Sequence, residues 1–143
     1  MSFNGNFNFG GTGGSFYNIG DIGSKIITFH YGAVINNIQI SEDDGTIIGD
    51  YGYEWDSAST SSKSATIPSD GIIHINSLYT NEIGGNVVIS YINAIIGNSS
   101  IQVGSINNPS AELQQRSGMY VTLTGIASGA YVDSLTFCLA QSS

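Results

Sequence analysis

Positive charge is almost absent from this sequence. Lys25, Lys63 and Arg116 are its permanent cations, against 11 acidic residues, and the formal net charge is -8. Proteins that bind a phosphate backbone or an anionic membrane surface do so with clustered cations. The composition therefore argues against nucleic acid and against anionic lipid as partners.

Cysteine pairs, long apolar runs and a leader segment are lacking as well. Cys138 has no second cysteine to pair with, and its apolar neighbours predict a buried, unreactive thiol. No stretch approaches the roughly 18 apolar residues of a membrane span, and the first residues form no basic-then-apolar leader. We expect a soluble chain without membrane insertion: cytosolic, nonclassically released, or mature after removal of a leader.

Helical periodicity is also missing, and short β-type runs take its place. Hydrophobic residues make up 41% of the 143 residues and charged residues 10%, which favours one folded domain spanning residues 1–143. Runs rich in Ile, Val, Thr, Tyr and Phe, bounded by Gly, Asn, Ser and Asp, predict an all-β protein. The expected strands are Asn4–Phe9, Ser15–Asn18, Lys25–Tyr31, Val34–Ser41, Thr46–Tyr51, Ser62–Ile67, Ile72–Tyr79, Asn86–Ile96, Ser100–Val103, Ala111–Gln114, Met119–Ile126 and Tyr131–Ala140.

An internal repeat relates the early and late parts of the chain. The segment Gly32–Ile40 superimposes on Gly129–Phe137 without a gap, and Gly84-Gly85 lies about midway between them. In each case a strand leads through a glycine-containing turn into a second strand, which predicts three related hairpin units that bury their apolar faces together. In the middle unit, Val88 and Ile89 follow the glycines where an acid or amide would be needed, so we expect that unit to lack a ligand site.

Two segments far apart in the sequence carry the candidate chemistry. The first is the glycine loop Gly10-Gly11-Thr12-Gly13-Gly14, and the second is Gly129-Ala130-Tyr131-Val132-Asp133. A carboxylate can accept hydrogen bonds from two hydroxyl groups, while glycine lets backbone N–H donors approach a ligand closely. Together the two segments predict a site for a neutral, hydroxylated ligand such as a sugar.

On these residues the chain resembles the jacalin-related lectins, including griffithsin-like lectins. The resemblance covers most of the chain and is most specific at Gly129–Asp133, where the family carries a Gly-x-x-x-Asp loop before the last strand. It implies a β-prism I fold, in which three Greek-key four-stranded sheets surround a pseudo-threefold axis. It also implies metal-independent sugar binding without a cofactor and without catalysis.

The resemblance assigns roles to individual residues. Asp133 would accept from two sugar hydroxyls, while Ala130, Tyr131 and Gly14 would donate backbone N–H groups. The Tyr131 ring would cover an apolar face of the sugar. The implied carbohydrate site is Gly13, Gly14, Gly129, Ala130, Tyr131 and Asp133.

The repeat implies a second site at Gly32, Ala33, Val34 and Asn36. Asn36 stands where an aspartate is expected, so its acceptor lacks charge assistance. The neighbouring loop is expected at Gly49-Asp50-Tyr51-Gly52. Galactose-preferring members expose a free amino-terminal glycine, whereas nine residues precede Gly10 here. We therefore expect mannose- or glucose-type glycans and glycoproteins as partners, with avidity from several sites or from a homodimer or higher oligomer.

Other readings remain open at this stage. An enzyme could use His30, His74, Glu42-Asp43-Asp44, or Glu54 and Asp56 around Trp55, but no nucleophile elbow or selected carboxylate pair appears. A calcium-dependent module could use the Glu42–Gly45 acids with Asp50, although their spacing suits a solvated turn better. A structural β-protein without sugar binding is the remaining alternative.

Overall fold

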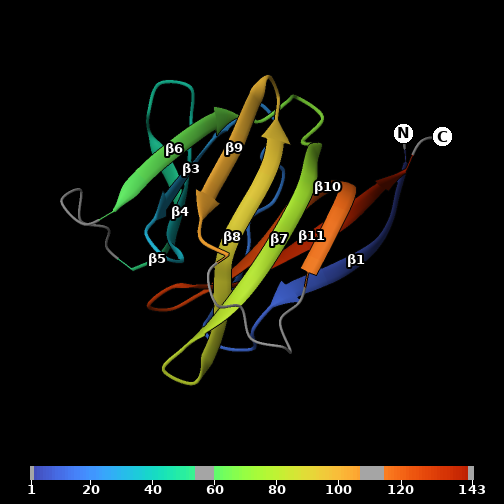
Figure 1. The fold of residues 1–143 in the computed structure, drawn as a ribbon. Coiled ribbons are helices and arrows are strands. Elements are labelled where there is room, and N and C mark those ends of the chain that lie inside the picture. The colour runs from blue at the N-terminus through green and yellow to red at the C-terminus, as the bar shows by residue number, and fades with distance from the viewer. Residues whose placement is uncertain (1, 54–59, 107–114, 142–143) are drawn as a thin grey trace.

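The computed structural model describes residues 2–53, 60–106 and 115–141, which form antiparallel strands joined by turns (Figure 1). Within these ranges no helix has the length and apolar character needed to cross a bilayer. The expected strand Ala111–Gln114 falls outside the described residues. The strands are β1 (Ser2–Gly10), β2 (Ser15–Asn18), β3 (Ile26–Tyr31), β4 (Ile35–Ser41), β5 (Ile47–Gly52), β6 (Ser61–Thr66), β7 (Ile73–Ile83), β8 (Asn86–Ile96), β9 (Ser99–Gly104), β10 (Gln115–Ser128) and β11 (Val132–Gln141).

The strands form three Greek keys of the same design. In one sheet the order is β5-β4-β3-β6: β3 and β4 form a hairpin, β5 adds beside β4, and β6 returns beside β3. In the next, β7, β8 and β9 follow in the same way and the first part of β10 returns beside β7. In the last, β10, β11 and β1 follow each other across the sheet and β2 returns beside β10. The expected β-prism topology is confirmed.

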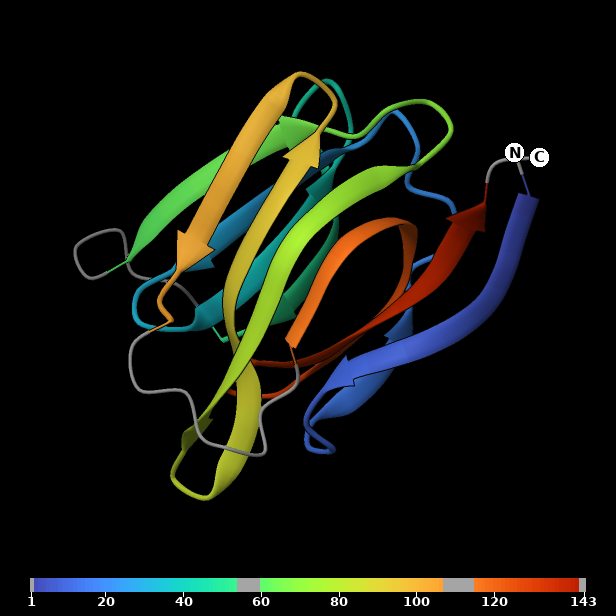
Figure 2. The same cartoon turned by 45° about the vertical axis from the view of Figure 1, so that its right-hand side comes forward.

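Strand β10 belongs to two of these sheets. Its residues Gln115–Val121 pair with β7, while Gly125–Ser128 pair with β2, so the strand passes from one face of the prism to another (Figure 2). The expected strand Met119–Ile126 is therefore too short at both ends. The chain termini meet between β1 and β11, where Ser2 pairs with Gln141.

The repeat seen in the sequence is confirmed in the register of the hairpins. Tyr31 pairs with Ile35 after a bulge, and Ser128 pairs with Val132 after a bulge in the same place. The turn bond also recurs, since Gly32 N–H donates to the Val34 carbonyl at 3.0 Å and Gly129 N–H to the Tyr131 carbonyl at 3.0 Å. The two matching segments of the sequence, Gly32–Ile40 and Gly129–Phe137, therefore begin with the same turn and bulge.

Three glycines occupy equivalent positions where the third strand of each Greek key ends. Gly10, Gly52 and Gly104 have φ values of 126°, 121° and 87°, and a Cβ on any of them would overlap a backbone carbonyl oxygen of the adjacent strand. Only glycine tolerates both conditions. The carbonyls belong to Asp133, Asn36 and Ser90, and each also accepts an N–H from the residue that follows its glycine: Gly11 at 2.9 Å, Tyr53 at 3.2 Å and Ser105 at 2.9 Å.

This equivalence corrects two expectations from the sequence. The middle-unit counterpart of Asp133 is Ser90, not Val88 or Ile89, because the β7–β8 hairpin continues beyond the level at which the other two hairpins turn. The loop beside Asn36 begins at Gly52 rather than Gly49, since Gly52 is the counterpart of Gly10.

The core lies between the three sheets and consists mainly of Ile, Leu, Val and Phe side chains, Phe9, Ile38, Leu78 and Phe137 among them. Tyr17 of β2 and Tyr51 of β5 close one seam between sheets, with ring centroids 5.5 Å apart. Cys138 is only half-buried, which corrects the expectation of a buried thiol: it pairs with Asn6 and Thr122 on the outer side of its sheet.

Candidate functional site

Asp133 lies near the start of β11, directly after the hairpin turn 129–131. Asp133 is only 7% exposed, and its backbone carbonyl accepts a hydrogen bond from the Gly11 N–H. The glycine loop follows β1, which pairs with β11 through Gly10 and Ser134. The sheet therefore brings two segments from opposite ends of the sequence side by side.

Gly13 and Gly14 touch the Asp133 carboxylate. A Cβ on Gly13 would lie 2.8 Å from Oδ2, and a Cβ on Gly14 would lie 2.6 Å from Oδ1. Gly14 also has a φ of 77° and leaves no room beside the Ser128 carbonyl, where a Cβ would come within 2.7 Å of the carbonyl carbon. The glycines are thus required for the loop to close on the carboxylate.

Three backbone N–H groups in the two loops have no backbone acceptor among the described residues. They belong to Gly14, Ala130 and Tyr131, the same residues that the sequence predicts as donors. Gly14 and Ala130 are exposed, and Tyr131 is half-buried. A carboxylate acceptor bordered by unpaired N–H donors on glycine-lined loops has the hydrogen-bonding pattern of a polyol site.

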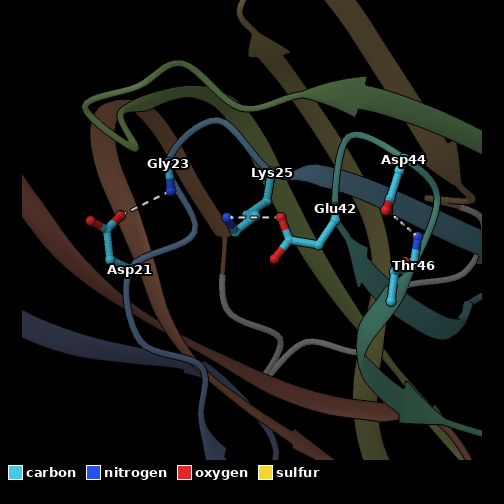
Figure 3. A network of polar contacts seen from close by, with 6 residues as sticks. All are labelled: Asp21, Gly23, Lys25, Glu42, Asp44 and Thr46. Carbon is cyan, nitrogen blue, oxygen red and sulfur yellow. Dashed lines mark hydrogen bonds and ion pairs between the residues drawn. The ribbon is translucent and has the colours of Figure 1, made fainter.

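The electrostatics favour an uncharged ligand. Burial raises the pKa of Asp133 above its usual range, while the nearby Gly129 N–H lowers it in part. Across the described part of the chain the ion pair found joins Lys25 and Glu42, at 3.1 Å and away from this site (Figure 3). No internal cation among the described residues therefore occupies the Asp133 oxygens, which can accept hydrogen bonds from a ligand.

The β7–β8 hairpin forms one wall beside the glycine loop, and sequence reasoning missed it. A Cβ on Gly11 would overlap the Val87 carbonyl, so the loop packs directly on the hairpin. Beside this contact, the loop and the hairpin line a cavity of about 250 Å³, formed by Gly10, Gly11, Thr12, Gly13, Thr80, Gly85, Asn86 and Val87. Thr80 is fully buried and its Oγ1 has no partner. The only sequence signal was the two-glycine turn Gly84-Gly85.

The structure places the second-site residues in an equivalent but altered setting. The N–H groups of Ala33 and Val34 have no backbone acceptor in the described ranges, as at Ala130 and Tyr131. Ser61 pairs with Tyr31 as Ser15 pairs with Ser128, so Thr60 is the counterpart of Gly14. The loop from Gly52 to Ser61 is also longer than the loop from Gly10 to Ser15. A Cβ is thus present where the first site requires glycine.

The alternative sites do not assemble among the described residues. Asp44 accepts from the Thr46 N–H at 2.9 Å and Glu42 pairs with Lys25 (Figure 3). Asp50 accepts from Asn37 Nδ2 at 2.7 Å. Gly45 has a φ of 92°, as an acidic turn requires. Among the described residues, no group of three or more His, Cys, Asp and Glu side chains could hold a metal ion.

The two histidines lie in strands. Nε2 of His30 is 3.0 Å from Gln39 Oε1, and the ring of His74 stacks on Tyr120. Glu54, Trp55 and Asp56 lie outside the described residues. The described part of the chain therefore brings Gly13 and Gly14 against Asp133, while each histidine contacts a residue of a neighbouring strand.

Comparisons with known proteins agree on the fold. The sequence matches no family model and no curated protein. Solved structures match over almost the whole chain. A mannose-specific jacalin-related lectin from Morus nigra, in complex with mannose, is 16% identical with a TM-score of 0.64 over 99% of this chain and 97% of that one.

Two further matches have the same character. A mannose-binding jacalin-related lectin from Ananas comosus is 13% identical, with a TM-score of 0.65 over 96% of this chain and 97% of that one. Wild-type Malaysian banana lectin is 15% identical, with a TM-score of 0.64 over 95% and 96%. The protein has the β-prism I fold of the jacalin-related lectins.

Proposed function

We propose that this protein is a lectin that binds mannose- or glucose-type glycans without a metal ion and without catalysis. Asp133 accepts from two neighbouring sugar hydroxyls. The Gly14, Ala130 and Tyr131 N–H groups donate to sugar oxygens, and Gly13 and Gly129 keep the approach open. The Tyr131 ring covers an apolar patch of the sugar.

The observation that carries this proposal is the contact of the glycine loop with one buried carboxylate. Gly13 and Gly14 lie against the Asp133 carboxylate, and the Gly14, Ala130 and Tyr131 N–H groups of the same two loops have no backbone acceptor among the described residues. Glycines at the contact points admit a ligand to backbone distance. The mannose named for the Morus nigra and Ananas comosus lectins supports the sugar class.

We propose that the second site, at Gly32, Ala33, Val34 and Asn36, binds the same sugars more weakly. Its acceptor is an uncharged amide, and Thr60 replaces the glycine that closes the first site. Single-site affinity is modest in either case, because exposed neutral hydrogen bonds exchange with water. Tight binding to glycoproteins then depends on multivalency.

Calorimetric titration with methyl α-mannoside, with and without a chelator, tests the main proposal. Native protein should bind equally in both conditions, and Asp133→Ala should bind at least about tenfold more weakly, since it removes charge-assisted bonds of about 1.5–3 kcal/mol. Asp44→Ala, an exposed acid on the β4–β5 turn, serves as the control and should bind normally. Loss of binding on chelation would favour the calcium-dependent alternative, and normal binding by folded Asp133→Ala would refute the site.

A further inference from the structure

A buried hydroxyl group lies beside the glycine loop, on a strand of another sheet. Thr80 belongs to β7, and Leu78, two residues earlier, is buried in the core, so the Thr80 side chain also points inward by the alternation of a strand. Thr80 is 0% exposed, and its Oγ1 has no hydrogen-bond partner among the described residues. Burying a hydroxyl without a partner costs free energy, so this group requires a partner supplied from the adjoining cavity.

The glycine loop adds backbone groups without backbone partners along the same cavity. Gly11 and Gly13 line the cavity and have no side chains, so the polar atoms that they offer belong to the backbone. The Gly11 N–H donates to the Asp133 carbonyl at 2.9 Å. The N–H groups of Thr12 and Gly13 have no backbone acceptor among the described residues. The cavity thus borders both an unpaired hydroxyl of β7 and unpaired backbone groups of the loop.

The chemistry of these groups suits a water molecule. Buried polar groups that lack protein partners are commonly joined by ordered water, which needs room and roughly two to four polar partners. The cavity has a volume of about 250 Å³, well above the ~30 Å³ that one water occupies in the liquid. A hydroxyl can donate to a water or accept from it, and a backbone N–H can donate to it.

We propose that Thr80 is a positioning residue of the sugar site, and that a water bound in this cavity links its hydroxyl to the backbone of the glycine loop. The inference rests on the function proposed above. Gly13 and Gly14 lie against the Asp133 carboxylate, so the position of the loop sets the geometry between that acceptor and the loop donors. Thr80 has no exposed surface, so it acts through the loop rather than on the ligand.

Two substitutions separate the hydroxyl of Thr80 from its methyl group. Thr80→Val removes the hydroxyl and keeps the branched shape, so the melting temperature should not fall. Its affinity for methyl α-mannoside should fall about two- to tenfold, the effect of one neutral hydrogen bond. Thr80→Ser keeps the hydroxyl and removes the methyl group, so it should be less stable than the native protein and bind mannoside equally well. A purely structural role for Thr80 would instead make binding follow stability in both variants.

The matched control is Thr28→Val, which removes a threonine hydroxyl from β3 in another sheet and should bind normally. The link to the loop is measured without sugar. NMR relaxation should show the amides of residues 11–14 to be more mobile in Thr80→Val than in the native protein. A crystal structure of the native protein should show a water within hydrogen-bond distance of Thr80 Oγ1.

The contrary outcomes are distinct. Unchanged loop mobility and native mannoside affinity in Thr80→Val would overturn the link. A trimannoside that binds native protein more tightly than methyl α-mannoside, with Thr80→Val losing only that gain, would assign the cavity to a second sugar residue instead of a water. If native protein bound no mannoside at all, the proposed function and the role of Thr80 in it would both fail, while the NMR comparison would still decide whether Thr80 holds the loop.

Discussion

At the scale of single residues, Asp133 is held in a state that costs the fold stability and that fits the ligand role we propose for it. The residue is only 7% exposed, its carboxylate has no cationic partner among the described residues, and its pKa is raised because burial disfavours the charge. A residue selected only for stability would be paired or neutral at this place. The unfavourable burial is the signature expected of a group reserved for an external partner.

This reasoning predicts opposite effects of Asp133→Asn on binding and on stability. The amide keeps the shape and one acceptor oxygen but removes the buried charge, so the melting temperature at neutral pH should rise. Binding should weaken by roughly ten- to hundredfold through lost charge assistance. Differential scanning calorimetry and mannoside titration on one preparation give both values. A variant that is less stable than native would show that the interaction of the carboxylate with the Gly129 N–H outweighs the cost of its buried charge.

The raised pKa of Asp133 also predicts how binding depends on pH. The ionised form accepts from the sugar, so affinity should fall on acidification, beginning at a higher pH than for an ordinary aspartate. The sign for stability is opposite: the folded state takes up the proton more readily than the unfolded chain, so this group contributes more stability as pH falls through the raised pKa. Titrations between pH 4 and 8, about the range of aspartate and histidine ionisation, should show the fall in native protein and a flatter profile in Asp133→Asn.

Gly13 offers a test of the contact between the glycine loop and the carboxylate. Its φ is ordinary, and an added Cβ would meet only the Asp133 carboxylate, 2.8 Å from Oδ2. Gly13→Ala should therefore displace the carboxylate and weaken mannoside binding with little loss of stability. Gly45→Ala is the binding control, because Gly45 lies on the β4–β5 turn outside the proposed site and its Cβ would meet no atom within 4 Å. Equal binding by both variants would mean that the loop position does not set the acceptor.

A substitution at Gly14 cannot test ligand binding separately from stability, although the motif places this residue in the site. The positive φ and the neighbouring Ser128 carbonyl mean that Gly14→Val would strain the backbone as well as block a ligand. Binding and stability would then fall together, and the two effects could not be separated at this position.

At the scale of elements, the end of each third strand depends on one glycine. Gly52→Ala should destabilise the protein by at least about 1–3 kcal/mol, because it combines a positive φ with overlap against the Asn36 carbonyl. Gly45→Ala has a positive φ but no atom within 4 Å of its Cβ, so only the conformational cost remains. Urea denaturation of both variants gives the difference, and equal losses would contradict a steric role for the repeated glycines.

The elements also show how far the sequence could predict the fold. Alternation and turn residues located most strands and the related hairpins, and the motif glycines predicted the candidate site, because both signals are local. The β7–β8 extension and the equivalence of Gly10, Gly52 and Gly104 were missed, since they depend on which strand lies beside which. The exchange of β10 between two sheets was missed as well: Gly125, beside a bulge in the middle of the strand, is a local signal for an irregularity but does not say which strand pairs on either side of it.

At the scale of the whole molecule, pseudo-threefold symmetry sets an upper limit on valency. The hairpin turns of the three units face one end of the prism, but among the described residues only the unit of β10, β11, β1 and β2 carries an aspartate, Asp133, with a closed glycine loop. The unit of β3, β4, β5 and β6 carries Asn36 and Thr60. The unit of β7, β8, β9 and β10 carries the buried Ser90 beneath a longer hairpin. We therefore expect each chain to have a stronger sugar site at Asp133, a weaker one at Asn36, and none at Ser90.

This ranking leads to a prediction about binding stoichiometry. Native protein should bind close to one methyl α-mannoside per chain at concentrations that saturate the Asp133 site, because the Asn36 amide contributes no charge. Asn36→Asp should raise the value toward two, since a carboxylate there can accept from sugar hydroxyls with charge assistance, while the Ala33 and Val34 N–H groups donate to sugar oxygens. Asp133→Asn should lower the affinity of the first site in the same assay.

The contrary result has a clear structural meaning. A stoichiometry of one that Asn36→Asp leaves unchanged would show that the second site, with Thr60 as the counterpart of Gly14, does not bind sugar whatever acceptor it holds. A monovalent chain cannot crosslink cells, so any agglutination would then require self-association. Stoichiometry and agglutination measured on the native protein and on Asn36→Asp thus decide whether valency resides in the repeats or in an assembly.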